Sequence, residues 1–287
     1  MFYLTIFAGL LALASAASLH GLSTYMDSDS PKVMFPEQAR GRTSSRIIAG
    51  QEAKLGQFPH QARIIIYKGL LSRSICGGAI ISETVVFTAA HCTYRSLLFD
   101  LGFGSINSDS PAVSMKTMRK VEHQDYDPSN LNNDVSLLIL PRKLSFNSNI
   151  KAIKLPSLSQ QDETFEHAKA TVSGHGKTAD DGQVSKRLMF TNVEVISNDE
   201  CVEYYNSDII RDFTLCAIGF DNDRQSTCNG DSGGPLITDD EESGEKIHIG
   251  VVSFVSGRGC EAGYPFGFVR TTSYLNWIHG NSGIEIE

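Results

Sequence analysis

The sequence has little positive charge and no cysteine spacing typical of a metal site. Its 287 residues include 25 Lys and Arg against 33 Asp and Glu, which gives a formal net charge of -8. Nucleic-acid-binding proteins need clustered basic residues, so this balance argues against a nucleic-acid partner. The six cysteines contain no Cys-x-x-Cys pair, so we expect no metal.

Long apolar runs and Asn-x-Ser/Thr sequons are also lacking, so we expect no membrane span and no N-glycans. The one marked apolar stretch, residues 1–14, is shorter than the roughly 20 residues that cross a bilayer. It ends in Ala14-Ser15-Ala16, a small-residue pattern at which signal peptides are cut, although only the α-amino group supplies a basic n-region. Residues 1–16 are therefore predicted to be a signal peptide of a secreted, extracellular protein.

Residues 17–46 are polar, show little periodicity and contain no cysteine, which indicates a propeptide rather than a folded module. This segment ends at Arg46, which is followed at once by the apolar Ile47 and Ile48. A basic residue in a polar stretch before an apolar pair is typical of a protease activation site. We expect a trypsin-like protease to cut after Arg46, and the propeptide then to leave because no disulfide holds it.

Short apolar runs rich in β-branched residues follow, separated by polar breaks. Examples are residues 63–67, 84–88 and 188–195. Their length and composition favour strands over helices, and their spacing predicts an all-β sandwich or barrel. One helix is predicted at about 272–280, where Tyr274, Trp277 and Ile278 share a face after residues 271–273, whose hydroxyls can cap it.

The stretch from Cys228 to Leu236 combines a small-residue turn, a carboxylate and a hydroxyl between apolar flanks. A serine hydroxyl is a poor nucleophile unless a base takes its proton and a carboxylate orients that base. A catalytic Ser232 therefore predicts a histidine and a carboxylate elsewhere in the chain. His91, in the turn Ala89-Ala90-His91-Cys92, can supply the base, and Asp134 opens an apolar run, which its neighbours Asp125 and Asp127 do not. The order His91, Asp134, Ser232 is that of chymotrypsin and excludes a lipase or esterase, which places Ser before His.

Together with Arg46-Ile47-Ile48-Ala49-Gly50 and Ser253-Phe254-Val255, these motifs resemble the trypsin/chymotrypsin family of serine proteases from about Ile47 to the C-terminus. Arthropod enzymes described as chymotrypsin-like, elastase-like or collagenolytic (brachyurin) are the most similar. The resemblance implies two six-stranded antiparallel β-barrels with the active site between them and a C-terminal α-helix. The protease domain would span 47–287, with one barrel at about 47–156 and the other at about 157–270.

The resemblance also assigns the roles. Ser232 would attack the scissile carbonyl, His91 would accept and return the proton, and Asp134 would hold the imidazole, while the N–H groups of Gly230 and Ser232 would form the oxyanion hole. After activation the new α-ammonium of Ile47 would pair with Asp231, so the uncut chain would be nearly inactive. Six thiols allow 15 pairings, and the family pattern selects Cys76 with Cys92, Cys201 with Cys216, and Cys228 with Cys260.

Substrate choice is less well defined. The base of the specificity pocket in this family corresponds to Ser226, a neutral residue that disfavours cleavage after Lys or Arg. The walls correspond to Ser253, Phe254 and Val255 and to Phe266. A bulky Val255 and Phe266 would fill the pocket and favour small or medium apolar residues, as in elastase, whereas a one-residue shift would place Gly267 at the wall and reopen a chymotrypsin-like pocket.

These features predict a serine endopeptidase made as a zymogen. It would use no cofactor and would act as a monomer on protein or peptide substrates, with protein inhibitors and the activating protease as further partners. The alternative is a catalytically silent homologue that binds or regulates other proteins.

Overall fold

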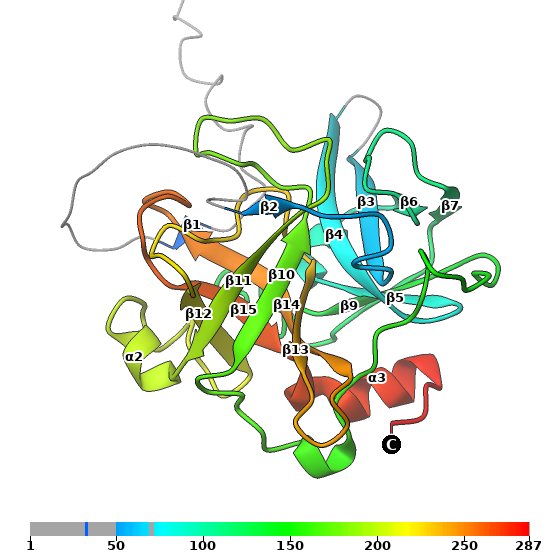
Figure 1. The fold of residues 1–287 in the computed structure, drawn as a ribbon. Coiled ribbons are helices and arrows are strands. Elements are labelled where there is room, and N and C mark those ends of the chain that lie inside the picture. The colour runs from blue at the N-terminus through cyan, green and yellow to red at the C-terminus, as the bar shows by residue number, and fades with distance from the viewer. Residues whose placement is uncertain (1–31, 34–49, 69–71, 287) are drawn as a thin grey trace, which may run out of the picture.

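The computed structural model describes residues 32–33, 50–68 and 72–286 (Figure 1). The expected signal peptide, most of the expected propeptide and the expected activation site lie outside the described residues. The described chain forms two antiparallel sheets that lie side by side, with a C-terminal helix packed below them in the view of Figure 1. No helix among the described residues is long and apolar enough to cross a membrane.

The second sheet contains a closed six-stranded barrel, as the sequence predicted. Strand β10 pairs with both β11 and β13, and β15 pairs with both β12 and β14, so the ring has no free edge. The strands are β10 (Lys169–Gly174), β11 (Met189–Ile196), β12 (Thr214–Gly219), β13 (Pro235–Asp239), β14 (Lys246–Ser256) and β15 (Phe266–Arg270).

The first sheet differs from the expected six-stranded barrel. It is a curled sheet of seven strands in the order β7-β6-β3-β4-β5-β9-β8. Its two edge strands, β7 and β8, are consecutive in sequence and are separated only by Met118 and Arg119. The chain bends at these two residues, so that β7 pairs with β6 at one edge of the sheet and β8 pairs with β9 at the other. The strands are β3 (Gln61–Lys68), β4 (Ser72–Ser82), β5 (Val85–Thr88), β6 (Leu98–Phe103), β7 (Val113–Thr117), β8 (Lys120–Glu122) and β9 (Ser136–Ile139).

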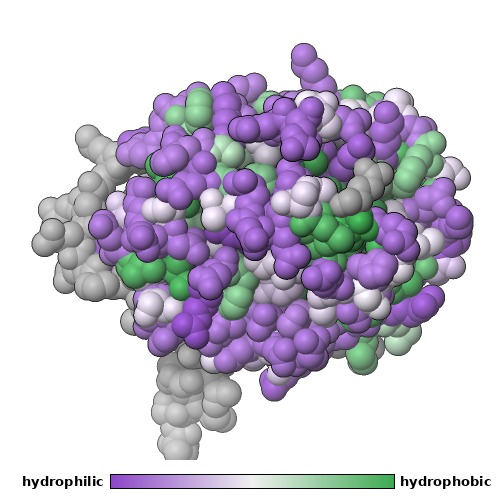
Figure 2. All heavy atoms as spheres, turned by 90° about the horizontal axis from the view of Figure 1, so that it is seen from below, coloured by the Kyte–Doolittle hydropathy of each residue, from purple (hydrophilic) through white to green (hydrophobic). Residues whose placement is uncertain are grey.

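Each sheet buries apolar side chains on its inner face, because alternate residues of a strand point to the same face. Phe87, Phe99 and Phe103 are buried inside the first sheet, and Phe266 and Phe268 inside the second. Full burial of one such side chain contributes about 1.5 to 3 kcal/mol to stability. The face in Figure 2 is accordingly mostly hydrophilic, with hydrophobic residues in small separate areas.

Two short strands extend the second sheet from the N-terminal side. Strand β2 (Gln51–Glu52) pairs with β11, so this stretch belongs to the second sheet although the sequence placed it with the first barrel. Strand β1 (Lys32–Val33), within the expected propeptide, pairs in parallel with the end of β14, where Lys32 lies opposite Val255. The backbone of this part of the expected propeptide thus runs beside a residue expected to line the specificity pocket.

The C-terminal helix begins later than the sequence predicted. Residues 271–274 form a 3-10 turn, and α3 (Leu275–Ser282) follows it, without a side-chain cap. The hydroxyls expected to cap the helix have other partners: Thr271 Oγ1 lies 2.8 Å from Nδ1 of His248, and Thr272 Oγ1 donates to the carbonyl of Glu163. Trp277 packs against the core of the first sheet, as expected. Two shorter helices are α1 (Ala90–Thr93) and α2 (Asn198–Val202), and a 3-10 turn covers residues 158–160.

Candidate active site

A cavity of about 770 Å³ holds the residues that the sequence singled out as nucleophile and base. Its walls come from both sheets. His91 and Cys76 belong to the first, and Gly230 and Ser232 to the turn that leads into β13 of the second. The fold therefore brings Ser232 and His91, far apart in sequence, to the lining of one cavity.

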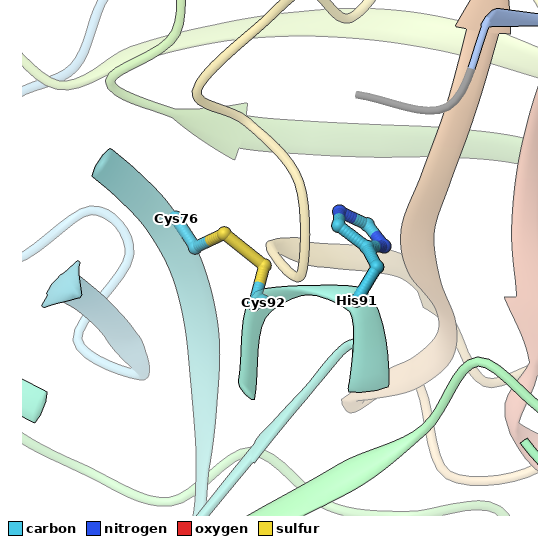
Figure 3. Close-up of side chains that lie close together, drawn as sticks. All are labelled: Cys76, His91 and Cys92. Carbon is cyan, nitrogen blue, oxygen red and sulfur yellow. A yellow bond between two sulfur atoms is a disulfide. The ribbon is translucent and has the colours of Figure 1, made fainter. Parts of the chain in front are cut away.

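His91 is held by the first sheet. It lies on α1 directly after β5, and the disulfide between Cys76 and Cys92 ties this one-turn helix to β4 (Figure 3). Its backbone N–H donates to Oδ1 of Asp134 at 2.7 Å, and its Nδ1 lies 2.7 Å from Oδ2 of the same carboxylate. The two contacts fix the orientation of the ring and make Nδ1 the protonated nitrogen, because a carboxylate only accepts.

Asp134 is fully buried and accepts a third hydrogen bond, from a residue that the sequence did not indicate as its partner. Ser253 Oγ donates to Asp134 Oδ2 at 2.7 Å. The sequence placed Ser253 in the wall of the specificity pocket, and nothing in its local pattern indicates a partner 119 residues away. The three donors compensate a buried charge that would otherwise be costly.

Ser232 lines the same cavity and is 7% exposed. Its carbonyl accepts a hydrogen bond from Gly77 N–H at 2.7 Å, which ties the turn to the first sheet. Nε2 of His91 is buried and has no hydrogen-bond partner among the described residues. The structure therefore joins base to acid directly, while the bond from Ser232 to His91 is not formed; such bonds are often long in free enzymes and tighten when substrate binds.

The backbone around Ser232 leaves two donors unused. Neither the Gly230 nor the Ser232 N–H donates to another residue of the described chain. Gly230 has φ of +102°, and a Cβ there would lie 3.2 Å from Ile75 Cγ2. Glycine is needed at this position, and the two amides are free to bind an oxyanion.

Asp231 is fully buried beneath the turn. Its carboxylate accepts hydrogen bonds from Gly176 N–H at 2.7 Å and from Cys228 N–H at 3.0 Å. Burial raises the pKa of Asp231 to about 6, although these two backbone hydrogen bonds act in the opposite direction. A Cβ on Gly176 would lie 2.4 Å from the carboxylate, so no larger residue fits there. Ile47, its expected partner, is outside the described residues.

The structure contains the three disulfides that the family pattern implied: Cys76–Cys92, Cys201–Cys216 and Cys228–Cys260. Two groups of side chains have ligand atoms close enough to hold a metal ion, namely Cys76, His91 and Cys92, and Asp180, Cys228 and Cys260. Each group contains a disulfide, so its sulfur atoms are not available as the thiolates that bind metals. The paired cysteines are 16, 15 and 32 positions apart in the sequence. Closing a loop of such a length contributes about 3 kcal/mol per disulfide to stability.

The residues expected to form the specificity pocket do not line the cavity beside Ser232. The Phe254 ring packs against Tyr205, with ring centroids 5.2 Å apart, and covers Gly267 so closely that a Cβ there would lie 2.0 Å from Phe254. The Phe254 ring therefore occupies the space beside Gly267, which the one-residue shift would need to be open. Ser226 is also buried, and its hydroxyl donates to the carbonyl of Thr227.

Phe266 is 1% exposed and packs against Phe268 in the core of the second barrel. Val255 packs against the cluster that contains Phe266 and against the Cys228–Cys260 disulfide. Val255 thus lies between the apolar cluster that contains Phe266 and the disulfide that precedes the turn of Ser232.

Two histidines with no role in this site are buried. His60 is 4% exposed and His175 is 5% exposed, and burial lowers the pKa of each to about 4. His60 packs edge-on against Phe58, and Nδ1 of His175 contacts the carbonyl of Ser185. Both contribute packing, which is the role the sequence favoured.

His60 should make the fold sensitive to mild acid. Below pH 6.5 the unfolded chain binds a proton at this residue, while the folded chain does so only near its pKa of about 4. The contribution of His60 to stability is therefore present above pH 6.5 and is lost as the pH falls towards 4, by about 3 kcal/mol in all. We expect His60→Gln to flatten the decline of the unfolding free energy between pH 7 and pH 4.5, measured by urea unfolding of a Ser232→Ala background that cannot digest itself. An unchanged slope in His60→Gln would contradict this assignment.

Comparisons with known proteins agree with this geometry. The family model described as Trypsin matches residues 47–278. A collagenase of Hypoderma lineatum is 40% identical over 239 residues, which covers 83% of this chain and 88% of that protein. A chymotrypsin of Phaedon cochleariae is 33% identical, with 83% of each chain covered, and a brachyurin of Leptuca pugilator is 31% identical, with 83% of this chain and 99% of that protein covered. A solved structure described as HL collagenase superposes with a TM-score of 0.76 at 38% identity, over 83% of this chain and 100% of that one.

Proposed function

The chain belongs to the trypsin family of serine endopeptidases, and from this premise we propose that it is a secreted zymogen, activated by cleavage after Arg46, that hydrolyses peptide bonds through an acyl-enzyme on Ser232. One observation carries the proposal: the imidazole of His91 is fixed by Asp134 with its Nε2 unpaired at the cavity that Ser232 lines. Three disulfides in a chain of this size support an oxidising, extracellular location. The enzyme acts as a monomer on protein substrates, under the control of an activating protease and protein inhibitors.

The geometry supports the following sequence of steps. When substrate enters, Nε2 of His91 takes the hydroxyl proton of Ser232 as Oγ bonds to the scissile carbonyl carbon. Asp134 stabilises the imidazolium, and the Gly230 and Ser232 amides receive the charge on the carbonyl oxygen. The imidazolium then protonates the leaving amine as the carbon–nitrogen bond breaks. Water next gives a proton to Nε2 of His91 as its oxygen bonds to the acyl carbon, and the imidazolium returns that proton to Oγ of Ser232 as the ester bond breaks.

The test is to cut the chain after Arg46 with trypsin and then add a serine-directed phosphonylating reagent. We expect one equivalent to attach at Ser232, detected by peptide mass spectrometry, and none to attach in Ser232→Ala. A folded, cut chain that remains unlabelled at Ser232 would favour the silent homologue, a binding or regulatory protein, over the enzyme.

For the residue before the cleaved bond we propose a preference for small or medium apolar side chains, in the manner of elastase rather than chymotrypsin. The burial of Phe266 and its shared cluster with Val255 support a filled pocket. The Phe254 ring covers Gly267, which argues against an open, chymotrypsin-like pocket with Gly267 at its wall. Native collagen belongs in the substrate panel because one similar protein is named collagenase.

Phe266→Gly should enlarge the pocket. We expect kcat/KM for peptides with Phe before the cleaved bond to rise at least 10-fold relative to those with Ala or Val, since one or two methylene groups change such ratios by about 10-fold to 200-fold. The matched control is Phe268→Leu, which changes the same core without opening the pocket wall. Comparing the Phe peptide with the Ala or Val peptide within each variant cancels any loss of active enzyme caused by destabilisation. A wild-type enzyme that already prefers Phe or Tyr would refute the filled pocket.

A further inference from the structure

The cavity beside Ser232 is positively charged although the chain as a whole carries a net charge of -8. Among the residues that the structure describes, five basic side chains line it and only one acidic side chain does. We call these five residues the basic cleft. They are Arg63, Lys68, Arg73, Lys177 and Lys186, and the acidic residue is Asp109.

Arg73 lies close to the oxyanion hole. Ile75, two residues further along β4, has its Cγ2 3.2 Å from the position that a Cβ on Gly230 would occupy. Residues two apart on a strand share a face and are separated by about 7 Å. Arg73 therefore lies on the wall of the cavity about 7 Å beyond the point at which β4 touches the Gly230 turn.

Lys177 approaches the same turn from the second sheet. Its backbone N–H donates to the carbonyl of Asn229 at 2.8 Å, and it pairs with Val184. The Cγ1 of Val184 is also 3.2 Å from the Cβ position on Gly230. Arg73 and Lys177 thus belong to two segments, one from each sheet, that both contact the turn of Gly230.

Only part of this positive charge is neutralised. Lys186 pairs with Asp109 at 2.8 Å, and Arg63 pairs with Asp100 at 3.4 Å. The structure records no ion pair for Arg73 or Lys177 with any residue of the described chain. The Arg63 side chain is 9% exposed, and its Nε is buried without a hydrogen-bond partner in that part of the chain. The basic cleft therefore has cationic donors to offer a ligand.

The cleft lies on the leaving-group side of the cleaved bond. His91, which returns the proton to the leaving amine, and the Cys76–Cys92 disulfide beside it line the cavity. The residues expected to wall the specificity pocket, which takes the side chain before the cleaved bond, do not line it. A substrate that runs past Ser232 accordingly places in the basic cleft the residues that follow the cleaved bond.

We infer that the basic cleft selects substrates with an acidic side chain at the second or third residue after the cleaved bond. This rests on the proposed protease function. An extended chain advances about 3.3 Å per residue, so the 7 Å from the Gly230 turn to Arg73 corresponds to two residues. Arginine and lysine bind carboxylates with charge-assisted hydrogen bonds that an amide of the same shape does not form as strongly.

The experiment uses internally quenched peptides that share one acyl half and differ only in having Asp, Asn or Lys at the second and third positions after the cleaved bond. We expect kcat/KM for the Asp peptides to exceed that for the Asn peptides by about 10-fold at low salt, and the ratio to shrink as NaCl shortens the reach of exposed charges. Arg73→Glu and Lys177→Glu should each bring the Asp-to-Asn ratio close to one. Arg142→Glu, an equal change of charge at an exposed site outside the cleft, should leave the ratio unchanged.

A chromogenic amide with the same acyl half and no residue after the cleaved bond separates this proposal from the proposed function. Hydrolysis of the amide with equal rates for Asp and Asn peptides would overturn the basic cleft alone. If the amide is not hydrolysed, binding of the corresponding leaving-group peptides to the trypsin-cut chain, followed by fluorescence anisotropy, still decides: tighter binding of the Asp peptide supports selection by the cleft, and equal binding overturns it. Equal peptide rates together with heparin binding that Arg73→Glu abolishes would assign the cleft to a sulfated polysaccharide and would also overturn the proposal.

Discussion

Asp134→Asn should lower kcat/KM for a peptide substrate by about 10⁴-fold. The carboxylate accepts from both the backbone N–H and Nδ1 of His91, at 2.7 Å each. An asparagine amide can present an N–H to Nδ1, which would move the ring proton to Nε2. Nε2 could then no longer accept the hydroxyl proton of Ser232, so the loss would appear in kcat while the fold is retained.

The measurement is the pH profile of kcat on the trypsin-cut enzyme, with labelling of Ser232 as a second readout. Asp125→Asn is the matched control, because Asp125 is an exposed carboxylate nine residues away that does not contact His91. Ser253→Ala removes one of the three hydrogen bonds to Asp134 and should cost far less, on the order of 10-fold. If Asp134→Asn and Asp125→Asn lowered kcat equally, Asp134 would not be the residue that orients His91.

The catalytic residues were the features best predicted from the sequence, because each lies in a recognisable local motif. Ser232 and His91 lie in short, recognisable turns, and the structure brings both to one cavity. Asp134 could be chosen over its neighbours because it alone opens an apolar run, and the structure places it on Nδ1 of His91. The disulfides needed more than spacing, since six thiols pair in 15 ways; the family pattern selected the pairs that the structure contains.

Contacts between distant segments were harder to predict. The bond from Ser253 to Asp134 spans 119 residues and depends on how two sheets meet, which no local pattern encodes. The basic cleft is similar, because its cations are scattered along the sequence and gather only when β3, β4 and the loops of the second sheet come together. The contact of Phe254 with Gly267 required the register between β14 and β15, in which these two residues are paired.

Sheet topology shows the same limit. Residues 113–122 were not among the apolar runs that predicted strands, and no local pattern indicated the bend at Met118 and Arg119 that divides this stretch between β6 and β9. Likewise, nothing in Gln51–Glu52 indicates that it pairs with β11 of the second sheet. Strand identity follows from composition, whereas strand partners depend on long-range packing.

Arg46→Gln should keep the enzyme inactive after trypsin treatment, with kcat/KM roughly 10²-fold to 4 × 10³-fold below that of the cut wild type. Removing one partner of a buried ion pair costs about 3 to 5 kcal/mol, and each 1.4 kcal/mol corresponds to a factor of ten. Asp231 has no cationic partner within the described residues: its carboxylate accepts from the Gly176 and Cys228 amides, and burial raises its pKa to about 6. The α-ammonium of Ile47, freed only by cleavage after Arg46, would supply the missing charge.

Arg42→Gln is the matched control, because it removes a neighbouring trypsin site and leaves Arg46 intact; we expect full activation and a new N-terminus that reads Ile47-Ile48-Ala49. Stability gives a second measurement. In the uncut chain the raised pKa means that Asp231 favours the folded state below pH 4 and that this contribution, about 3 kcal/mol, is lost as the pH rises from about 4 to 6. Pairing with the ammonium should remove that loss in the cut chain, so unfolding free energies at pH 4 and pH 7 should differ less after cleavage. Full activity of trypsin-treated Arg46→Gln would show that the turn around Ser232 is formed without the new N-terminus.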